Sequence, residues 1–119
     1  MIRAFLVALI LPIAGGARAG DLTGADIRNE LIGQTMSWWE TDGWNRGEMR
    51  LEPGGAARLV VSAPAPAQDA GRWTLDGDRL CTVWSALREE RKCYAVRRVA
   101  PGRYLTSGGN MFEIVFAGT

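Results

Sequence analysis

The sequence of 119 residues predicts an all-β protein, an antiparallel up-and-down meander of about eight strands preceded by one short helix. Three observations support this fold class. Apolar and polar residues alternate with a period of two in segment after segment beyond Thr35, which is typical of a sheet with one buried face. Turn-forming pairs such as Asp76-Gly77 and Pro101-Gly102 separate these segments. Two cysteines stand in one stretch that can form a stapled hairpin.

Residues 1–19 are predicted to be a secretory signal peptide. Arg3 supplies a positive charge, residues 4–14 form an apolar run, and Ala17-Arg18-Ala19 matches an A-x-A cleavage site. The apolar run is too short to span a bilayer, although a retained anchor is the alternative. We expect cleavage after Ala19, a periplasmic or secreted protein with no membrane span, and a single barrel-like domain over residues 20–119.

Residues 21–33 predict the one helix. Thr23 can cap its start, with Asp26 as the reciprocal partner of a capping box. Ile27 and Leu31 share one face, and Gly33 suits the left-handed position that ends a helix. So short a helix is not stable alone, and we expect it to pack on the sheet as a plug or lid.

The expected strands are joined by short connections, which favour pairing between neighbours in the chain. A small closed barrel of the lipocalin or streptavidin kind leaves no exposed edge; an open or SH3-like curled sheet is the alternative. Strands of about six residues favour a packed interior, although eight strands can also enclose one small ligand. A loop containing two prolines is expected at residues 63–68. The strands begin near Thr35, Gly47, Ala56, Gly71, Arg79, Lys92, Arg103 and Met111.

Cys81 and Cys93 are predicted to form a structural disulfide, because exported chains fold in an oxidising compartment. If the two cysteines lie opposite each other, Leu80 faces Tyr94, and Trp84 lies on that same side of the hairpin. The disulfide is then on the other side. A redox pair would more commonly read C-x-x-C, and a zinc site would need more ligands than two cysteines.

Four short motifs occur in order along the chain: L-x-G-x-T, G-x-W, L-C-x-x-W and C-Y. In this order they resemble a family of small exported proteobacterial proteins of unknown function. The resemblance implies a periplasmic β-rich domain and assigns no catalytic residue. The motif positions are Leu31, Gly33, Thr35, Gly71, Trp73, Leu80, Cys81, Trp84, Cys93 and Tyr94.

The composition favours a protein that is not an enzyme and needs no cofactor or metal. The sequence has no histidine, G-x-S-x-G motif or phosphate-binding loop. Glu40 and Asp42 could form an acid/base pair, but we interpret them as solvated loop charges. The 14 basic residues fall to 12 without Arg3 and Arg18, against 13 acidic residues, which gives no electrostatic reason to expect nucleic acid as a partner.

The stretch from Trp38 to Trp44 holds three of the five tryptophans. Neighbouring residues of a strand point to opposite faces, so Trp38 is expected inside and Trp39 outside. The predicted structural core therefore includes Trp38, Trp73, Trp84 and Tyr94, and the predicted binding surface consists of Trp39, Glu40, Asp42 and Trp44. In the alternative interpretation, Trp44 covers the barrel mouth and Trp39 packs on the helix.

The predicted function is a non-enzymatic periplasmic module. It binds a protein partner of the cell envelope, as an accessory subunit or inhibitor, through the exposed aromatic patch. The alternative is a barrel that binds an apolar or sugar-like small ligand, with Trp38, Trp44 and Trp84 at its mouth. An enzyme ranks third. An internal cavity would favour the ligand, and a filled barrel with an exposed aromatic patch would favour the partner.

Overall fold

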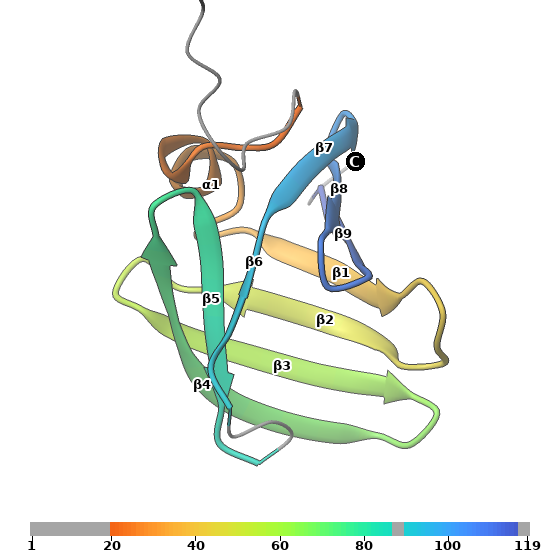
Figure 1. The fold of residues 1–119 in the computed structure, drawn as a ribbon. Coiled ribbons are helices and arrows are strands. Elements are labelled where there is room, and N and C mark those ends of the chain that lie inside the picture. The colour runs from red at the N-terminus through yellow and green to blue at the C-terminus, as the bar shows by residue number, and fades with distance from the viewer. Residues whose placement is uncertain (1–19, 87–89, 117–119) are drawn as a thin grey trace, which may run out of the picture.

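The structure is a computed structural model that describes residues 20–86 and 90–116. In this part the chain forms one helix and nine antiparallel strands of a single barrel-shaped sheet (Figure 1), which confirms the predicted fold class. The predicted signal peptide lies outside the described residues, as do residues 87–89 between Cys81 and Cys93. The elements are α1 (Gly24–Glu30), β1 (Thr35–Glu40), β2 (Arg46–Leu51), β3 (Ala56–Ala63), β4 (Ala67–Asp76), β5 (Arg79–Trp84), β6 (Lys92–Tyr94), β7 (Val96–Ala100), β8 (Arg103–Thr106) and β9 (Asn110–Ile114).

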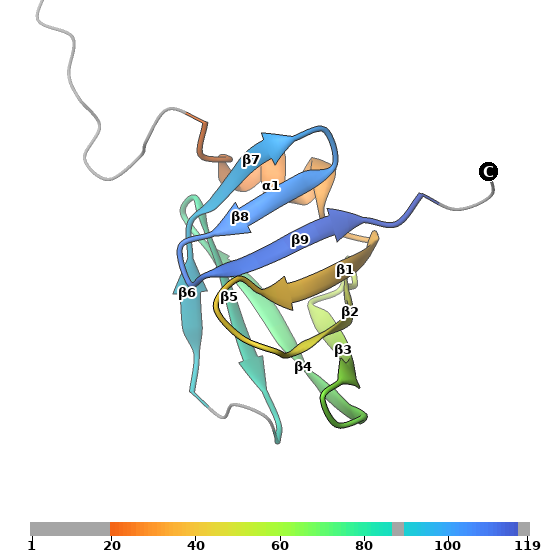
Figure 2. The same cartoon turned by 90° about the vertical axis from the view of Figure 1, so that its right-hand side faces the viewer.

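The sheet is an up-and-down meander that returns to its first strand. β1 pairs with β2 on one side and with β9 on the other, so the first and last strands of the chain lie side by side (Figure 2). The spatial order is β6-β5-β4-β3-β2-β1-β9-β8-β7. The two edge strands, β6 and β7, are therefore consecutive in the chain.

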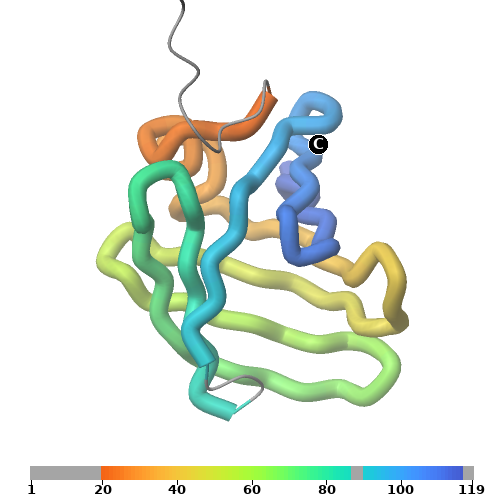
Figure 3. Tube along the Cα trace, viewed as in Figure 1, coloured from red at the N-terminus to blue at the C-terminus, as the bar shows by residue number. Residues whose placement is uncertain are grey.

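One bent stretch of chain closes the barrel at this seam (Figure 3). β6 pairs with β5, whereas β7 pairs with β8, and only Ala95 separates them. The Ala95 carbonyl accepts a hydrogen bond from the Ser107 amide at 2.9 Å, and the Ala95 amide donates to Ser107 Oγ at 3.1 Å. A single strand was expected to begin near Lys92. The change of partner at Ala95 divides it in two and makes nine strands of the expected eight.

β4 begins earlier than the sequence indicates, at Ala67 rather than near Gly71, and the expected loop at residues 63–68 shrinks to residues 64–66. Val61 of β3 lies opposite Ala67, so backbone pairing continues almost to the prolines. Pro64 and Pro66 stand outside the strands, because proline has no N–H to offer a ladder.

Helix α1 closes one end of the barrel. The predicted capping box is present: Thr23 Oγ1 accepts from the Asp26 amide at 3.1 Å, and Asp26 Oδ2 accepts from the Thr23 amide at 3.0 Å. Ile27 and Leu31 are fully buried. The helix is shorter than the expected 21–33, since the preceding segment pairs with β7 instead: the Leu22 amide donates to the Val96 carbonyl at 2.7 Å.

A charged network fastens the last turn of α1 to β7 and β8. Glu30 accepts a hydrogen bond from Arg98 Nε at 3.0 Å and another from the Tyr104 hydroxyl at 3.0 Å. The Arg98 guanidinium also forms an ion pair with Glu30. These bonds, above all the one from Arg98, hold the pKa of Glu30 below its ordinary value. Burial, followed by the hydrogen bond to Glu30, raises the pKa of Tyr104.

The replacement Glu30→Gln should reduce the loss of stability in acid. The unfolded carboxyl has the higher pKa and binds more protons, so this ion pair adds stability above the unfolded pKa that is lost as the pH falls through the folded pKa. We expect a contribution of about 1 kcal/mol or less, because the partners are partly exposed. Urea unfolding at neutral and acidic pH measures it. The control is Glu48→Gln, which removes an exposed carboxylate of β2. An unchanged acid slope in Glu30→Gln would contradict the prediction.

Candidate functional site: a cavity at the loop end of the barrel

The end of the barrel opposite α1 is hollow. A cavity of about 560 Å³ reaches from the buried Leu80 to Pro64 and Ala65, which are exposed in the β3–β4 loop. Residues of the β1–β2 and β8–β9 loops also line it, including Asp42 and Gly108. Because these exposed loop residues line it, the cavity opens to solvent. The β1–β2 and β3–β4 loops lie away from α1 (Figure 1), so the opening is at the end of the barrel that α1 does not cover.

Side-chain size explains why only this half is hollow. At the helix end the interior is filled by long apolar side chains that are fully buried, among them Met36, Leu51 and Ile27. Small residues from several segments meet at the loop end: Ala65, Ala67, Thr82, Gly108 and Gly109. Close packing needs large side chains opposite small ones, and the small side chains at this end leave part of the interior unfilled. The expectation of a packed interior is therefore wrong for this half of the barrel.

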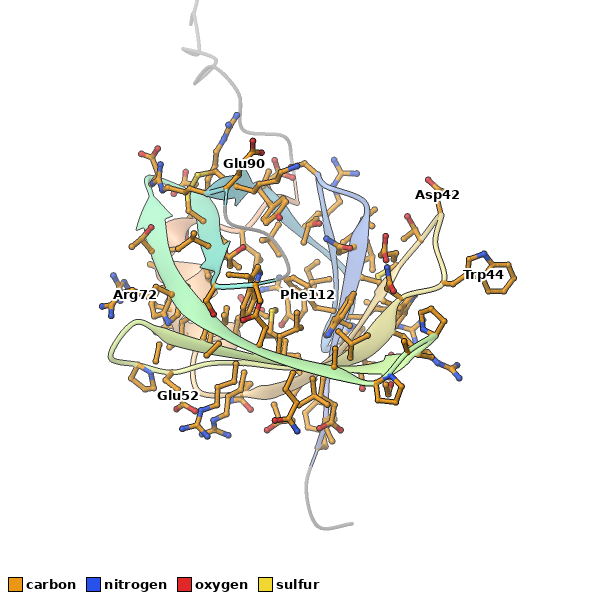
Figure 4. The ribbon with its side chains drawn as sticks, turned by 90° about the horizontal axis from the view of Figure 1, so that it is seen from below. Asp42, Trp44, Glu52, Arg72, Glu90 and Phe112 are labelled. Carbon is orange, nitrogen blue, oxygen red and sulfur yellow. A yellow bond between two sulfur atoms is a disulfide. The ribbon has the colours of Figure 1, made fainter. Side chains whose placement is uncertain are left out.

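Four aromatic side chains form the walls of the cavity: Trp38, Trp84, Tyr94 and Phe112. They come from β1, β5, β6 and β9. Trp38 and Phe112 are register partners, so they lie side by side on the inner face, and Figure 4 shows Phe112 inside the barrel. Tyr94 lies against Gly108, where an added Cβ would stand only 2.6 Å from the ring. A side chain at Gly108 would therefore displace this wall.

Polar side chains are concentrated toward the mouth. Glu40 follows Met36 and Trp38 on the inner face of β1, and its register partner is Asn110 of β9. Asp42 and Asn45 stand on the exposed β1–β2 loop and also line the cavity. Neither Glu40 nor Asp42 belongs to any of the ion pairs found in residues 20–86 and 90–116. The mouth therefore carries two uncompensated carboxylates.

Trp38 has an unsatisfied donor. Its indole Nε1 is buried and has no hydrogen-bond partner among the described residues. Buried indole nitrogens normally donate a hydrogen bond, so a buried indole nitrogen without an acceptor is unusual. Since the Trp38 ring lines the cavity, it lies at the border between the apolar core and the space that a ligand can occupy.

The structure divides the predicted binding surface of Trp39, Glu40, Asp42 and Trp44. Both carboxylates line the cavity, whereas both tryptophans line a neighbouring groove on the outer face of β1–β3; Glu40 borders the two. Trp44 is 87% exposed and points away from the barrel (Figure 4), so the alternative in which it covers the mouth is wrong, as is its place beside Trp38 and Trp84 at a ligand mouth. Trp39 pairs with Arg46 and Met111 near the end of β1 that is remote from α1.

Of the predicted core residues, Trp73 and Trp84 are buried, and Trp38 and Tyr94 are half-buried in the cavity wall. The Cys81–Cys93 disulfide is present, with Leu80 opposite Tyr94 as expected. Asn110, Thr82 and Phe112 also line the cavity, although no binding role was predicted for them. A signal for Glu40 was present in the sequence. The alternation that places Met36 and Trp38 inside the barrel, continued to the end of the strand, would have placed Glu40 on the same inner face.

Fold and site together define an antiparallel barrel with a solvent-open cavity, aromatic walls and an acidic mouth. Comparisons with known protein families, curated proteins and solved structures found no match for this chain. The resemblance carried by the four sequence motifs therefore stays a prediction. Within the described part of the chain, no helix has the length and apolar character needed to cross a membrane. The same part holds no cluster of three or more potential metal ligands.

Proposed function

We propose that this protein is a non-enzymatic binding module that holds one small organic ligand inside its barrel. The observation that carries the proposal is the open cavity of about 560 Å³. Sites for small molecules are concave, span roughly 300–1,000 Å³, and combine apolar or aromatic walls with a few polar groups. Trp38, Trp84, Tyr94 and Phe112 supply such walls, and Glu40 with its neighbours supplies the polar groups.

The proposed place of action is the periplasm or the space outside the cell. The Cys81–Cys93 disulfide indicates an oxidising compartment other than the cytoplasm. The signal-like pattern of residues 1–19 supports export to that compartment, and the motif resemblance implies the same. An exported binding module meets small molecules that the cell takes up, releases or senses.

The proposal assigns no catalytic residue. The sequence contains no histidine, and the cavity lining offers carboxylates, amides, one threonine and aromatic rings. Without a base beside it, the buried Thr82 hydroxyl is a weak nucleophile, and its chemistry suits hydrogen bonding. These groups can orient and hold a ligand.

Filling the cavity should abolish ligand binding. The probe is N-phenyl-1-naphthylamine, an uncharged fluorophore that brightens in apolar surroundings. Wild-type protein should bind it saturably with equimolar stoichiometry. Ala67→Phe places a ring in the cavity from the inner face of β4 and should weaken binding by about tenfold or more.

The matched control is Ala70→Phe, which adds the same ring on the same strand but on its outer face. This variant should bind the probe as the wild type does. Absence of saturable binding by the wild type would contradict the proposed function, and so would an equal loss in both variants.

A second candidate function is binding of a protein partner in the cell envelope, and the exposure of Trp44 favours it. A tryptophan that is 87% exposed beside a second one, Trp39, is typical of an interaction hot spot. The wild type should capture a specific protein from an envelope extract, and Trp44→Ala should capture far less while its melting temperature stays unchanged. Equal capture by both proteins would rule out this surface.

A further inference from the structure

We infer that the ligand is an organic cation, an ammonium group that carries apolar substituents. The inference rests on the proposed function and names the chemical class that the cavity selects. It comes from three properties of the lining: several aromatic faces, two carboxylates at the mouth, and an absence of basic side chains among the described lining residues.

The aromatic rings favour a cation over a neutral molecule of the same shape. The face of an aromatic ring carries negative charge density and attracts a cation within about 6 Å of its centre. Tryptophan is the strongest such ring, and two of the four rings here, Trp38 and Trp84, are tryptophans. The four rings come from two pairs of neighbouring strands, β5 with β6 and β1 with β9, so the cavity has aromatic walls in two parts of the sheet.

The carboxylates favour the same charge. Glu40 stands on the inner face of β1 and is half-buried, whereas Asp42 is exposed at the tip of the β1–β2 loop. Within the described residues neither is neutralised by an ion pair, and the lining that leads inward contains no arginine or lysine. Carboxylates at the mouth of a cleft with low-dielectric walls attract cations and repel anions.

The remaining polar groups are compatible with a cation. Asn45, Asn110 and Thr82 each present an oxygen that can accept a hydrogen bond, although their N–H and O–H groups can also donate. The discrimination against an anion therefore comes from the two carboxylates, which no basic side chain among the described lining residues offsets. A neutral sugar can donate to Glu40 but brings no positive charge to balance it.

The test compares choline with 3,3-dimethylbutan-1-ol, which has the same shape but a carbon atom in place of the charged nitrogen. Affinity is measured by calorimetry and by the change in tryptophan fluorescence. Choline should bind about tenfold more tightly than the alcohol, and added salt should weaken choline alone.

Glu40→Gln should remove most of this preference, with affinity for the alcohol unchanged. Asp42→Asn should also reduce the preference for choline, but by less. Asp42 is exposed at a loop tip, so this replacement should leave the fold intact. Glu48→Gln makes the same change of charge on the outer face of β2 and should leave the preference intact. Circular dichroism and thermal melts establish that each variant is folded. If Glu40→Gln does not fold, the effect of Asp42→Asn on the preference for choline tests the inference.

The outcomes separate the inference from the proposed function. If N-phenyl-1-naphthylamine binds but choline is no tighter than the alcohol, the cation inference fails and the binding barrel stands. Tighter binding of 3,3-dimethylbutanoate or of methyl α-D-glucopyranoside would overturn the inference in the same way. If the neutral probe and all of these ligands fail to bind, both proposals fail.

Discussion

Trp73→Ala is expected to lower the free energy of unfolding by about 3–5 kcal/mol, the largest effect of any single replacement considered for this chain. Trp73 is 4% exposed and lies on the inner face of β4, at the end of the barrel that α1 closes. Its indole Nε1 donates to the Glu52 carbonyl at 2.6 Å, and the Arg28 guanidinium lies 5.4 Å from the ring centre. Alanine removes the ring, leaves that carbonyl without its donor, and opens a void among close-packed side chains.

Urea unfolding at low temperature measures this effect, since a domain of this size has only about 5–15 kcal/mol of stability in total. Trp73→Phe should be intermediate, because it keeps an aromatic ring but not the hydrogen bond. The control is Trp44→Ala, the same chemical change at a side chain that is 87% exposed, which should cost about 1 kcal/mol or less. Comparable losses in Trp73→Ala and Trp44→Ala would show that the assignment of core and surface is wrong.

Reduction of the Cys81–Cys93 disulfide should cost about 2–4 kcal/mol. The bond joins β5 to β6, an edge strand of three residues with only three register pairs to β5. The same stretch of chain continues through Ala95 into β7 and closes the barrel. Losing the disulfide therefore weakens the barrel at its seam, where the β5–β6 ladder is short.

The measurement compares urea unfolding of the wild type with and without a reductant. Reduction is cleaner than substitution, because Cys81 is 1% exposed and alanine there would also leave a void. The double variant Cys81→Ala/Cys93→Ala is the control for the reductant, which should not change its stability. Equal unfolding curves for oxidised and reduced wild type would refute a stabilising role.

The predictable parts of this protein depend on residues close together in the chain. Thr23 and Asp26 are three positions apart, so their capping box can be read from the sequence and is present in the structure. Period-two alternation predicted the sheet, and the spacing of Cys81 and Cys93 predicted which residues of their hairpin face each other. At Ala95 the chain stops pairing with β5 and begins to pair with β8. This change has no such local signal, because it depends on the position of β8 in the folded sheet.

The candidate site was only partly predictable for the same reason. The sequence marked the stretch from Trp38 to Trp44 as unusual, but it did not show that Glu40 lines the cavity while Trp39 and Trp44 line the outer groove. Whether the stretch binds a ligand or a partner depends on this division. It follows from where β1 ends and its loop begins, which is fixed by pairing with β2 and β9.

Local patterns in the sequence were enough to predict an antiparallel meander with a capped helix and one disulfide, because alternation, capping and turn chemistry act over a few residues. The hollow half of the barrel became visible only in the folded structure. Ala67, Thr82 and Gly108 are ordinary residues in their own segments, and all three line the cavity. Closure of the sheet brings these distant segments together around a space that their side chains do not fill. A cavity is the space left between such segments, and no single segment encodes it.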